Sequence, residues 1–217
     1  MNKQAILKKT TLFVNKALAG EGTGHDWWHI ERVLNNARAI NAKENADQFI
    51  IDLAVLLHDV GDRKVIGKDE DDYTIAEDFL RANKVPGEVV DQVLFIIKHM
   101  SFSHSLNKRR ADAPKEFHIV QDADRLDALG AIGIARVFAF GGSKHRPLYD
   151  PTKKPQPINT TANYRKLESS SFHHFHEKIL LLKDLMNTPT GKSIAKQRHQ
   201  YLENYMKQFL LEWEGKR

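Results

Sequence analysis

Cysteine is absent from the 217 residues of this sequence. Its absence excludes a disulfide-stabilised scaffold, thiolate zinc sites, iron–sulfur clusters and a cysteine nucleophile. No stretch approaches the ~18 unbroken apolar residues that a membrane span needs. Lys8, Lys9 and Lys16 also interrupt the start of the chain, where a signal peptide would be continuously apolar. We therefore expect a cytoplasmic protein with no membrane partner.

Signals for β-structure and for several enzyme classes are missing as well. No segment sustains an alternation of apolar and polar residues, and no Asn-Gly turn occurs. The patterns GxxxxGK[ST], GxGxxG and GxSxG are absent, so the enzyme classes that depend on them have no support. Apolar residues instead recur at helical spacing along nearly the whole chain, which predicts an all-α bundle of about 9–10 helices.

The composition fits a globular chain with an anionic partner. Hydrophobic residues make up 41% of the sequence, which is enough to build a sizeable core. The 33 basic residues exceed the 28 acidic residues by 5, so a phosphorylated small molecule and a nucleic acid both suit the charge. The basic run 108–110 adds to the case for nucleic acid, but it lacks the interleaved aromatic residues of a stacking platform. Nucleic acid is therefore an alternative partner that we do not favour.

Two strongly apolar segments should form buried helices. The first, FIIDLAVLLHDV, lies in a helix at about 47–59 with Gly61 placed to end it. The second is VVDQVLFIIKHM at 89–100. An amphipathic helix opens the chain. The next helix contains Trp28, which we expect in the core. Trp27 precedes it and could stack on a base. Further helices are expected at 73–83, 117–140, 172–186 and 193–213.

A long segment at 141–165 has the composition of a loop, being rich in Gly, Pro, Lys and Asn. Loops of this length are usually functional covers or disordered segments. A cover over an anion would suit several basic residues of this loop, among them Lys144, His145, Arg146, Lys153 and Lys154. A solvated surface loop is the alternative, and the spacing does not decide between the two.

Histidines and carboxylates stand next to the apolar helices. His29 lies in HDWWHIERV, His58 and Asp59 end AVLLHD, and Asp124 lies in QDADRLDALG. A buried charge without a partner costs several kcal/mol, and a shared cation would remove that cost. Imidazoles and carboxylates without sulfur suit Mn²⁺, Fe²⁺ or Mg²⁺, and Zn²⁺ less definitely. A rival pair is His25 with His29 at helical spacing, and any one histidine taken alone is more often a structural residue.

Taken together, HIERV, LLHDVGD and DADRLDALG resemble the HD-domain metal-dependent phosphohydrolases. GHDWWHIERV, HMSFS and EKILLLKDLMNT look more closely like the small bacterial YedJ-like group of that superfamily, and the resemblance covers nearly the whole chain. It implies an HD-type fold with a divalent metal, Mn²⁺ favoured, held by His29, His58, Asp59 and Asp124. We expect a single domain over 1–217, with the metal-site core at about 25–130 and C-terminal helices at about 171–213 packed on it.

Further residues are predicted to serve catalysis and substrate binding. Asp62 follows the helix break, and related HD nucleotidases keep a carboxylate there that orients the attacking water, so Asp62 is the predicted general base. Asp127 shares a helical face with Asp124 and is predicted either to contact the sugar or to orient a metal ligand. Lysine or histidine side chains would offset phosphate charge, and the candidates are Lys64, His99, Lys178 and Lys183. His99 could instead help to hold a second metal.

The resemblance implies hydrolysis of a phosphate ester or anhydride. The favoured activity is pyrophosphohydrolysis of a nucleoside triphosphate to the monophosphate and pyrophosphate, but the residues do not select which phosphorus is attacked. A 5′-nucleotidase using the same site is the nearest alternative. A non-catalytic module that binds a ligand or nucleic acid is the alternative from another class. The oligomeric state is left open, with a homodimer as one outcome.

Overall fold

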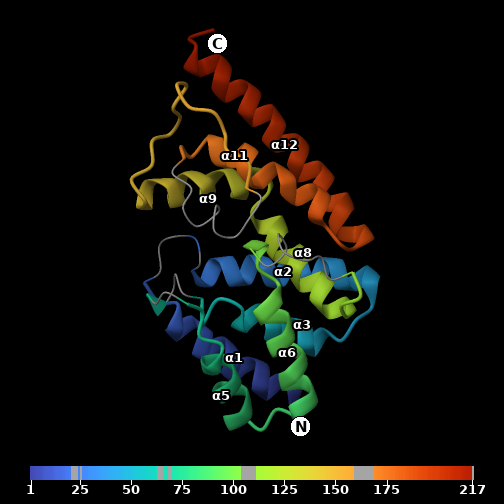
Figure 1. Ribbon diagram of the computed structural model, residues 1–217. Helices are drawn as coiled ribbons and strands as arrows, with labels where there is room; N and C mark the ends of the chain where they lie inside the picture. The colour runs from blue at the N-terminus through green and yellow to red at the C-terminus, as the bar shows by residue number, and fades with distance from the viewer. Residues whose placement is uncertain are drawn as a thin grey trace.

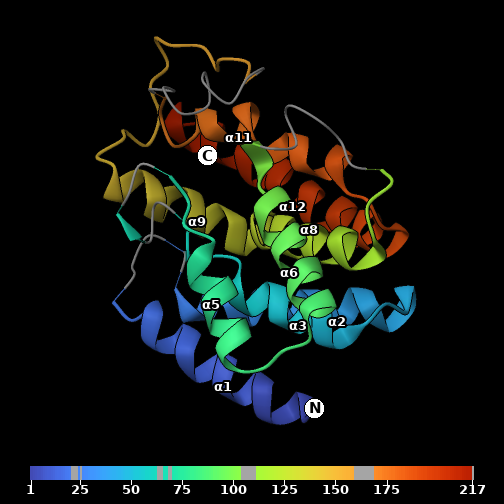
Figure 2. The same cartoon turned by 60° about the horizontal axis from the view of Figure 1, so that its bottom comes forward.

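The computed structural model describes residues 1–20, 24, 26–62, 66–67, 70–103, 111–158 and 169–216. Within these ranges the protein is all-α, with nine α-helices, one 3₁₀ helix and no strand, as the periodicity predicts. The elements are α1 (Lys3–Ala17), α2 (Trp27–Glu44), α3 (Gln48–Leu57), α5 (Thr74–Ala82), α6 (Gly87–His99), α8 (Lys115–Asp127), α9 (Gly130–Ser143), α11 (His173–Glu177), η1 (Ile179–Leu185) and α12 (Pro189–Trp213). Figures 1 and 2 place α9, α11 and α12 together, at the end of the molecule away from α1 and α5.

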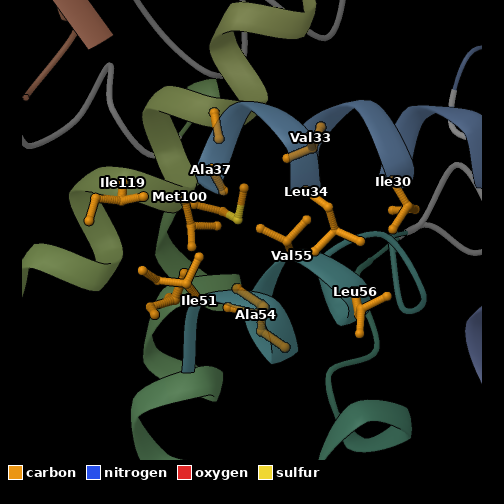
Figure 3. Close-up of a cluster of buried hydrophobic side chains, with 14 of the residues drawn as sticks. Ile30, Val33, Leu34, Ala37, Ile51, Ala54, Val55, Leu56, Met100 and Ile119 are labelled. Atoms are coloured by element: carbon orange, nitrogen blue, oxygen red, sulfur yellow. The ribbon is translucent and has the colours of Figure 1, made fainter. Parts of the chain in front are cut away.

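Helix α3 is the centre of the core. Every residue from Phe49 to Leu57 is buried, and α3 packs against α1, α2, α6 and α8. Figure 3 shows Val55 on α3 facing Leu34 on α2. Full burial of each such side chain contributes about 1.5–3 kcal/mol, so the apolar run read from the sequence fixes α3 firmly. The end of α3, where the His58–Asp59 doublet follows, is therefore held in place from several sides.

The two tryptophans at the start of α2 reverse one sequence expectation. Trp28, predicted in the core, is 61% exposed, whereas Trp27 packs against the core. The reason lies in the helical period, because Trp27 precedes Ile30 and Leu34 by three and seven residues and shares their buried face. Trp28 shares instead the solvent-facing side of the helix.

The predicted helix at 117–140 is two helices. It breaks between Asp127 and Gly130, and α8 and α9 meet at a bend of 69°. Gly130 has φ +71, a left-handed conformation that glycine adopts without the strain of a Cβ. Among the described residues no single helix is long and apolar enough to cross a membrane, and α8 with α9 passes that test only as this bent pair.

The predicted helix at 172–186 is also interrupted. Lys178, with φ −137 and ψ −53, separates the short α11 from the 3₁₀ helix η1. The last helix begins earlier than predicted, at Pro189, where the Thr188 side chain accepts a hydrogen bond from the Gly191 N–H at 2.9 Å. Asp122 of α8 accepts from the Thr188 N–H and hydroxyl, both at 2.8 Å, so α8 is joined to the start of α12.

The predicted loop at 141–165 begins three residues later, because α9 continues to Ser143. Its described part, 144–158, packs on the C-terminal helices. Backbone hydrogen bonds run from the Ser171 and Phe172 amides to the Pro147 and Leu148 carbonyls. Tyr149 joins an aromatic cluster, which we define as Tyr149, Phe172, Phe175, Phe209 and Trp213. This part of the loop is thus anchored, and residues 159–165 lie outside the described ranges.

Candidate metal centre

Three helices bring the four predicted ligand side chains together. His29 lies in the first turn of α2, where the N-cap Asp26 side chain accepts from the His29 N–H at 2.9 Å. His58 is the C-cap of α3 and Asp59 follows it, while Asp124 lies on α8. Figure 1 shows α8 beside α2, the pair of helices that carries the first and the last of these residues.

The facing atoms of these four residues lie close to a common point. His29 Nε2 is 3.3 Å from His58 Nε2, 3.4 Å from Asp59 Oδ2 and 3.5 Å from Asp124 Oδ1. His58 Nε2 is 3.4 Å from Asp59 Oδ1 and 4.0 Å from Asp124 Oδ1. Two ligand atoms that bind one ion at ~2.1 Å each, at angles of 90–110°, are separated by about 3.0–3.4 Å. His29, His58 and Asp59 meet that spacing, and Asp124 lies slightly farther out.

Both imidazoles have their second nitrogen engaged. His29 Nδ1 lies 2.7 Å from Asp127 Oδ2, and His58 Nδ1 lies 2.8 Å from the Val55 carbonyl oxygen. Both acceptors favour the tautomer that carries its proton on Nδ1, which leaves the Nε2 lone pairs directed at the common point. Second-nitrogen partners of this kind hold metal-binding histidines in proteins. The donor set therefore fits a divalent metal ion.

Burial and charge act in opposite directions on the two imidazoles. Burial lowers the pKa of His29, which has an almost inaccessible side chain. Burial also lowers the pKa of His58, but the Asp59 and Asp124 carboxylates outweigh it and raise that pKa above its ordinary value. Asp124 is the open member of the group, with 33% of its side chain exposed against 6% for Asp59. A ligand would therefore approach from the Asp124 side.

Asp127 is a buried carboxylate with several donors. Besides His29, Arg32 donates from Nε to Oδ1 at 2.7 Å and from Nη2 to Oδ2 at 3.0 Å. Burial alone would raise the pKa of Asp127, but hydrogen bonds from His29 and Arg32 hold it well below its usual range. Sequence analysis left two roles for Asp127, and these contacts are those of a residue that orients His29 rather than one that meets a sugar.

The loop after the His58–Asp59 doublet is fixed by backbone contacts. The Asp62 N–H donates to the Asp59 carbonyl at 3.1 Å, so the predicted general base sits in a turn beside the four-residue cluster. The Asp72 N–H donates to the Gly61 carbonyl at 2.8 Å, and a Cβ at Gly61 would lie 2.1 Å from the Asp72 carbonyl oxygen. Gly61 was expected to end the preceding helix. That helix already ends at Leu57, and glycine is required at 61 by this close approach.

The remaining predicted residues are more dispersed. His99 ends α6 and its ring packs edge-on against Phe95, with centroids 4.9 Å apart. Lys178 Nζ lies 5.1 Å from the centre of the Phe102 ring, and Lys183 Nζ lies 3.9 Å from Asp184. These contacts do not themselves bring His99, Lys178 or Lys183 to the four-residue cluster. Lys64 and His25, the rival partner of His29, lie outside the described residues.

Sequence reasoning missed two partners of the cluster. The Val55 carbonyl carries no signature in the sequence, because any residue there supplies the same oxygen. Arg32 did leave a signal, since it lies three residues after His29 and so on the same face of α2. A buried histidine followed at this spacing by an arginine suggests that both reach one carboxylate.

Comparison with known proteins identifies the family of this chain. Residues 27–129 match the HD domain family. The chain is 38% identical over 206 residues to the protein YpgQ of Bacillus subtilis, a match that spans 95% of this chain and 92% of YpgQ. A crystal structure of YpgQ in complex with ADP superposes with a TM-score of 0.76 at 34% identity, over 96% of this chain and 95% of that one.

Two further crystal structures are similar over almost their full length. A Lactobacillus plantarum protein has a TM-score of 0.85 at 33% identity, over 99% of this chain and 100% of that one. A protein from Bacillus thuringiensis described as an HD-superfamily hydrolase has a TM-score of 0.74 at 42% identity, over 98% of this chain and 99% of that one. The chain therefore belongs to the HD-domain superfamily, as a close homologue of YpgQ and of the HD-superfamily hydrolases.

Proposed function

We propose that this protein is a divalent-metal-dependent phosphohydrolase that acts on a nucleotide. The favoured reaction is pyrophosphohydrolysis of a nucleoside triphosphate to the monophosphate and pyrophosphate. One observation carries the proposal: the imidazole Nε2 atoms of His29 and His58 lie 3.3 Å apart, and each lies 3.4–4.0 Å from a carboxylate oxygen of Asp59 and of Asp124. The ADP bound to YpgQ supports a nucleotide as the ligand class.

In this proposal His29, His58, Asp59 and Asp124 hold the cation, with Mn²⁺ favoured over Mg²⁺, Fe²⁺ and Zn²⁺ because the donors are nitrogen and oxygen without sulfur. When bound, such a cation lowers the pKa of a coordinated water from 15.7 towards ~7 and polarises a phosphoryl oxygen. Asp59 and Asp124 supply the negative charge that balances the cation. Asp127 and the Val55 carbonyl keep both Nε2 lone pairs in place during turnover.

Asp62 is the proposed general base. It follows Asp59 by three residues, and its backbone is tied to the Asp59 carbonyl. As general base, the Asp62 carboxylate would accept a proton from the attacking water, a contribution of about 10²–10⁴-fold for a positioned base. The variant Asp62→Asn should therefore keep its metal and lose about 10²–10⁴-fold in turnover. Equal turnover in Asp62→Asn and the wild type would mean that another group is the general base.

Binding of the phosphates is assigned to cationic side chains. Lys64, His99, Lys178 and Lys183 are the proposed residues. Positive side chains that reach the phosphates would offset the charge that develops on the phosphoryl oxygens in the transition state. Each can be tested singly, because loss of a substrate contact raises KM, whereas loss of a contact made only in the transition state lowers kcat.

The experiment that tests the proposal separates the metal from the reaction. The protein is dialysed against a chelator and assayed with nucleoside mono-, di- and triphosphates in Mn²⁺, Mg²⁺, Zn²⁺ or no metal. Phosphate and pyrophosphate are measured separately. Pyrophosphate release from triphosphates supports the favoured reaction, and phosphate release from monophosphates supports a 5′-nucleotidase at the same site.

The variant His58→Ala is the control, because it removes one ligand and leaves the substrate-binding residues unchanged. Metal-dependent turnover that disappears in His58→Ala ties the reaction to the cluster. If the protein turned over no nucleotide and bound RNA or DNA tightly, we would conclude that it is a non-catalytic binding module.

A further inference from the structure

Arg136 of α9 connects two parts of the chain that meet at the metal centre. Its Nη1 donates to Asp127 Oδ2 at 2.9 Å, and its Nη2 donates to the Gly24 carbonyl oxygen at 2.9 Å. Only 21% of its side chain is exposed. One guanidinium thus bridges α9, the carboxylate that holds His29, and the backbone that leads into α2.

Gly24 is shaped to receive this guanidinium. It has φ +95, in the region that favours glycine, and a Cβ there would lie 3.3 Å from Arg136 Nε. Two residues later, Asp26 caps α2 by accepting from the His29 N–H on its side chain and from the Ile30 N–H, at 3.4 Å, on its carbonyl. The position of Gly24 therefore bears directly on the first turn of α2.

We infer that Arg136 is a positioning residue that fixes His29 from both ends, through Asp127 at the imidazole and through Gly24 at the backbone that enters α2. The inference rests on the proposed function only in treating His29 as a metal ligand. Arg136 does not reach the ligand atoms itself, so its effect is on the placement of His29.

Arg32 provides the comparison that separates the two contacts. Both Arg32 hydrogen bonds within the described residues go to Asp127, one to each carboxylate oxygen, at 2.7 and 3.0 Å. Arg136 divides its donors between Asp127 and Gly24. A lysine at 136 would keep the positive charge but, as a single point donor, could not span both acceptors as a planar fork does. Charge and bridging are therefore separable by substitution.

The test compares Arg136→Gln, Arg136→Lys and Arg32→Gln with the wild type. Hydrogen exchange of the His29 and Ile30 amides is measured in metal-free protein, and the Kd for Mn²⁺ is measured by calorimetry. Arg136→Gln should accelerate exchange of both amides and weaken Mn²⁺ binding by about 10–100-fold, the usual cost of losing an outer partner of a ligand. Arg136→Lys should retain the exchange defect. Arg32→Gln should weaken Mn²⁺ binding with little change in exchange.

The variant Gly24→Ala approaches the same contact from the other side and keeps the test decisive if Arg136→Gln fails to fold. It should displace the guanidinium and accelerate the same amides. The inference is overturned if the His29 and Ile30 amides exchange at the wild-type rate in Gly24→Ala and also in either Arg136 variant. It is overturned as well if Arg32→Gln accelerates these amides as much as Arg136→Gln does. If wild-type protein binds no Mn²⁺ the proposed function fails, and the exchange rates alone then decide the role of Arg136.

Discussion

The candidate metal centre, which comprises His29, His58, Asp59, Asp124 and the supporting Asp127, and the aromatic cluster bury their side chains by opposite means. In the first region, buried imidazole and carboxylate groups meet one another, with His29, Asp59 and Asp127 almost inaccessible. In the aromatic cluster, Phe172 packs against Phe209 and Tyr149 with ring centroids 4.6 and 5.0 Å apart. Aromatic packing is favourable mainly through the apolar area that it buries, and preferred ring geometries add to that term. A buried charge is tolerated only while each partner stays in place.

The two regions should therefore respond differently to the same perturbation. A change in the aromatic cluster alters the free energy of unfolding and leaves metal affinity alone. A substitution at the metal centre alters metal affinity. It alters the free energy of unfolding only where it leaves a charged side chain unpaired or weakens binding of the cation. Each of the following substitutions tests this difference between the two regions.

The largest loss of stability is expected from Phe172→Ala. Phe172 is 2% exposed, and its removal leaves a cavity among the rings of Tyr149, Phe175 and Phe209. We expect the free energy of unfolding to fall by about 3–5 kcal/mol, measured by urea denaturation. The Kd for Mn²⁺ of the folded protein should stay within about twofold of the wild type. A large change in that Kd would show that the two regions are coupled.

Asp127→Asn should be the next largest, because it leaves two arginine side chains without a carboxylate. The side chains of Arg32 and Arg136 are 32% and 21% exposed, so we expect about 3 kcal/mol, the lower end for breaking a buried pair. The pKa of Asp127 is depressed in the folded state. Its stabilisation is therefore fully present above pH 3.8, the ordinary value, and is lost as the pH falls further.

Urea denaturation of the wild type and Asp127→Asn over a range of pH checks the direction of this pH dependence. The difference between wild type and Asp127→Asn should be constant near neutral pH and narrow below pH 3.8. A difference that widens on acidification would mean that Asp127 is not held as a carboxylate.

The sequence predicted the convergence of the metal-centre residues but not every helix break or contact. The order of His29, His58, Asp59 and Asp124 beside apolar helices predicted that these side chains converge, because burial forces polar groups to share partners. The breaks at Gly130 and Lys178 were missed, because the flanking residues keep a helical pattern through both. The prediction that Trp28 lies in the core was wrong, although the helical spacing of Trp27 to Ile30 and Leu34 would have indicated that Trp27 is the buried one. Asp127 was identified from the sequence, but the choice between its two predicted roles needed the structure, since its donors come from α2 and α9, far apart in the sequence.

Asp124→Ala should alter stability only when metal is present. At a Mn²⁺ concentration of 100 times Kd, binding stabilises the folded state by about 2.7 kcal/mol. The variant keeps three of the proposed ligands and should lose most of that increment. In excess chelator the two proteins should unfold within about 0.5 kcal/mol of each other, because Asp124 is partly exposed. Full Mn²⁺ occupancy in Asp124→Ala would remove this residue from the ligand set.

The smallest effect is expected at the joint between the two regions. Thr188 caps α12 and donates its hydroxyl to Asp122 Oδ2, so Thr188→Ala should cost about 0.5–2 kcal/mol of unfolding free energy. Thr188→Ser keeps the hydroxyl and is the matched control.

Metal affinity is the informative measurement for this joint. Asp122 and Asp124 lie two residues apart on α8 and so about 200° apart around the helix, with Asp122 facing Thr188 and Asp124 facing His29. Loss of the cap should leave the Asp124 face undisturbed, because α8 stays packed on α2 and α3. We therefore expect the Kd for Mn²⁺ in Thr188→Ala to match that of Thr188→Ser. A shared weakening of stability and metal binding in Thr188→Ala alone would mean that α12 holds α8 in register, and that the aromatic end of the molecule helps to place the metal ligands.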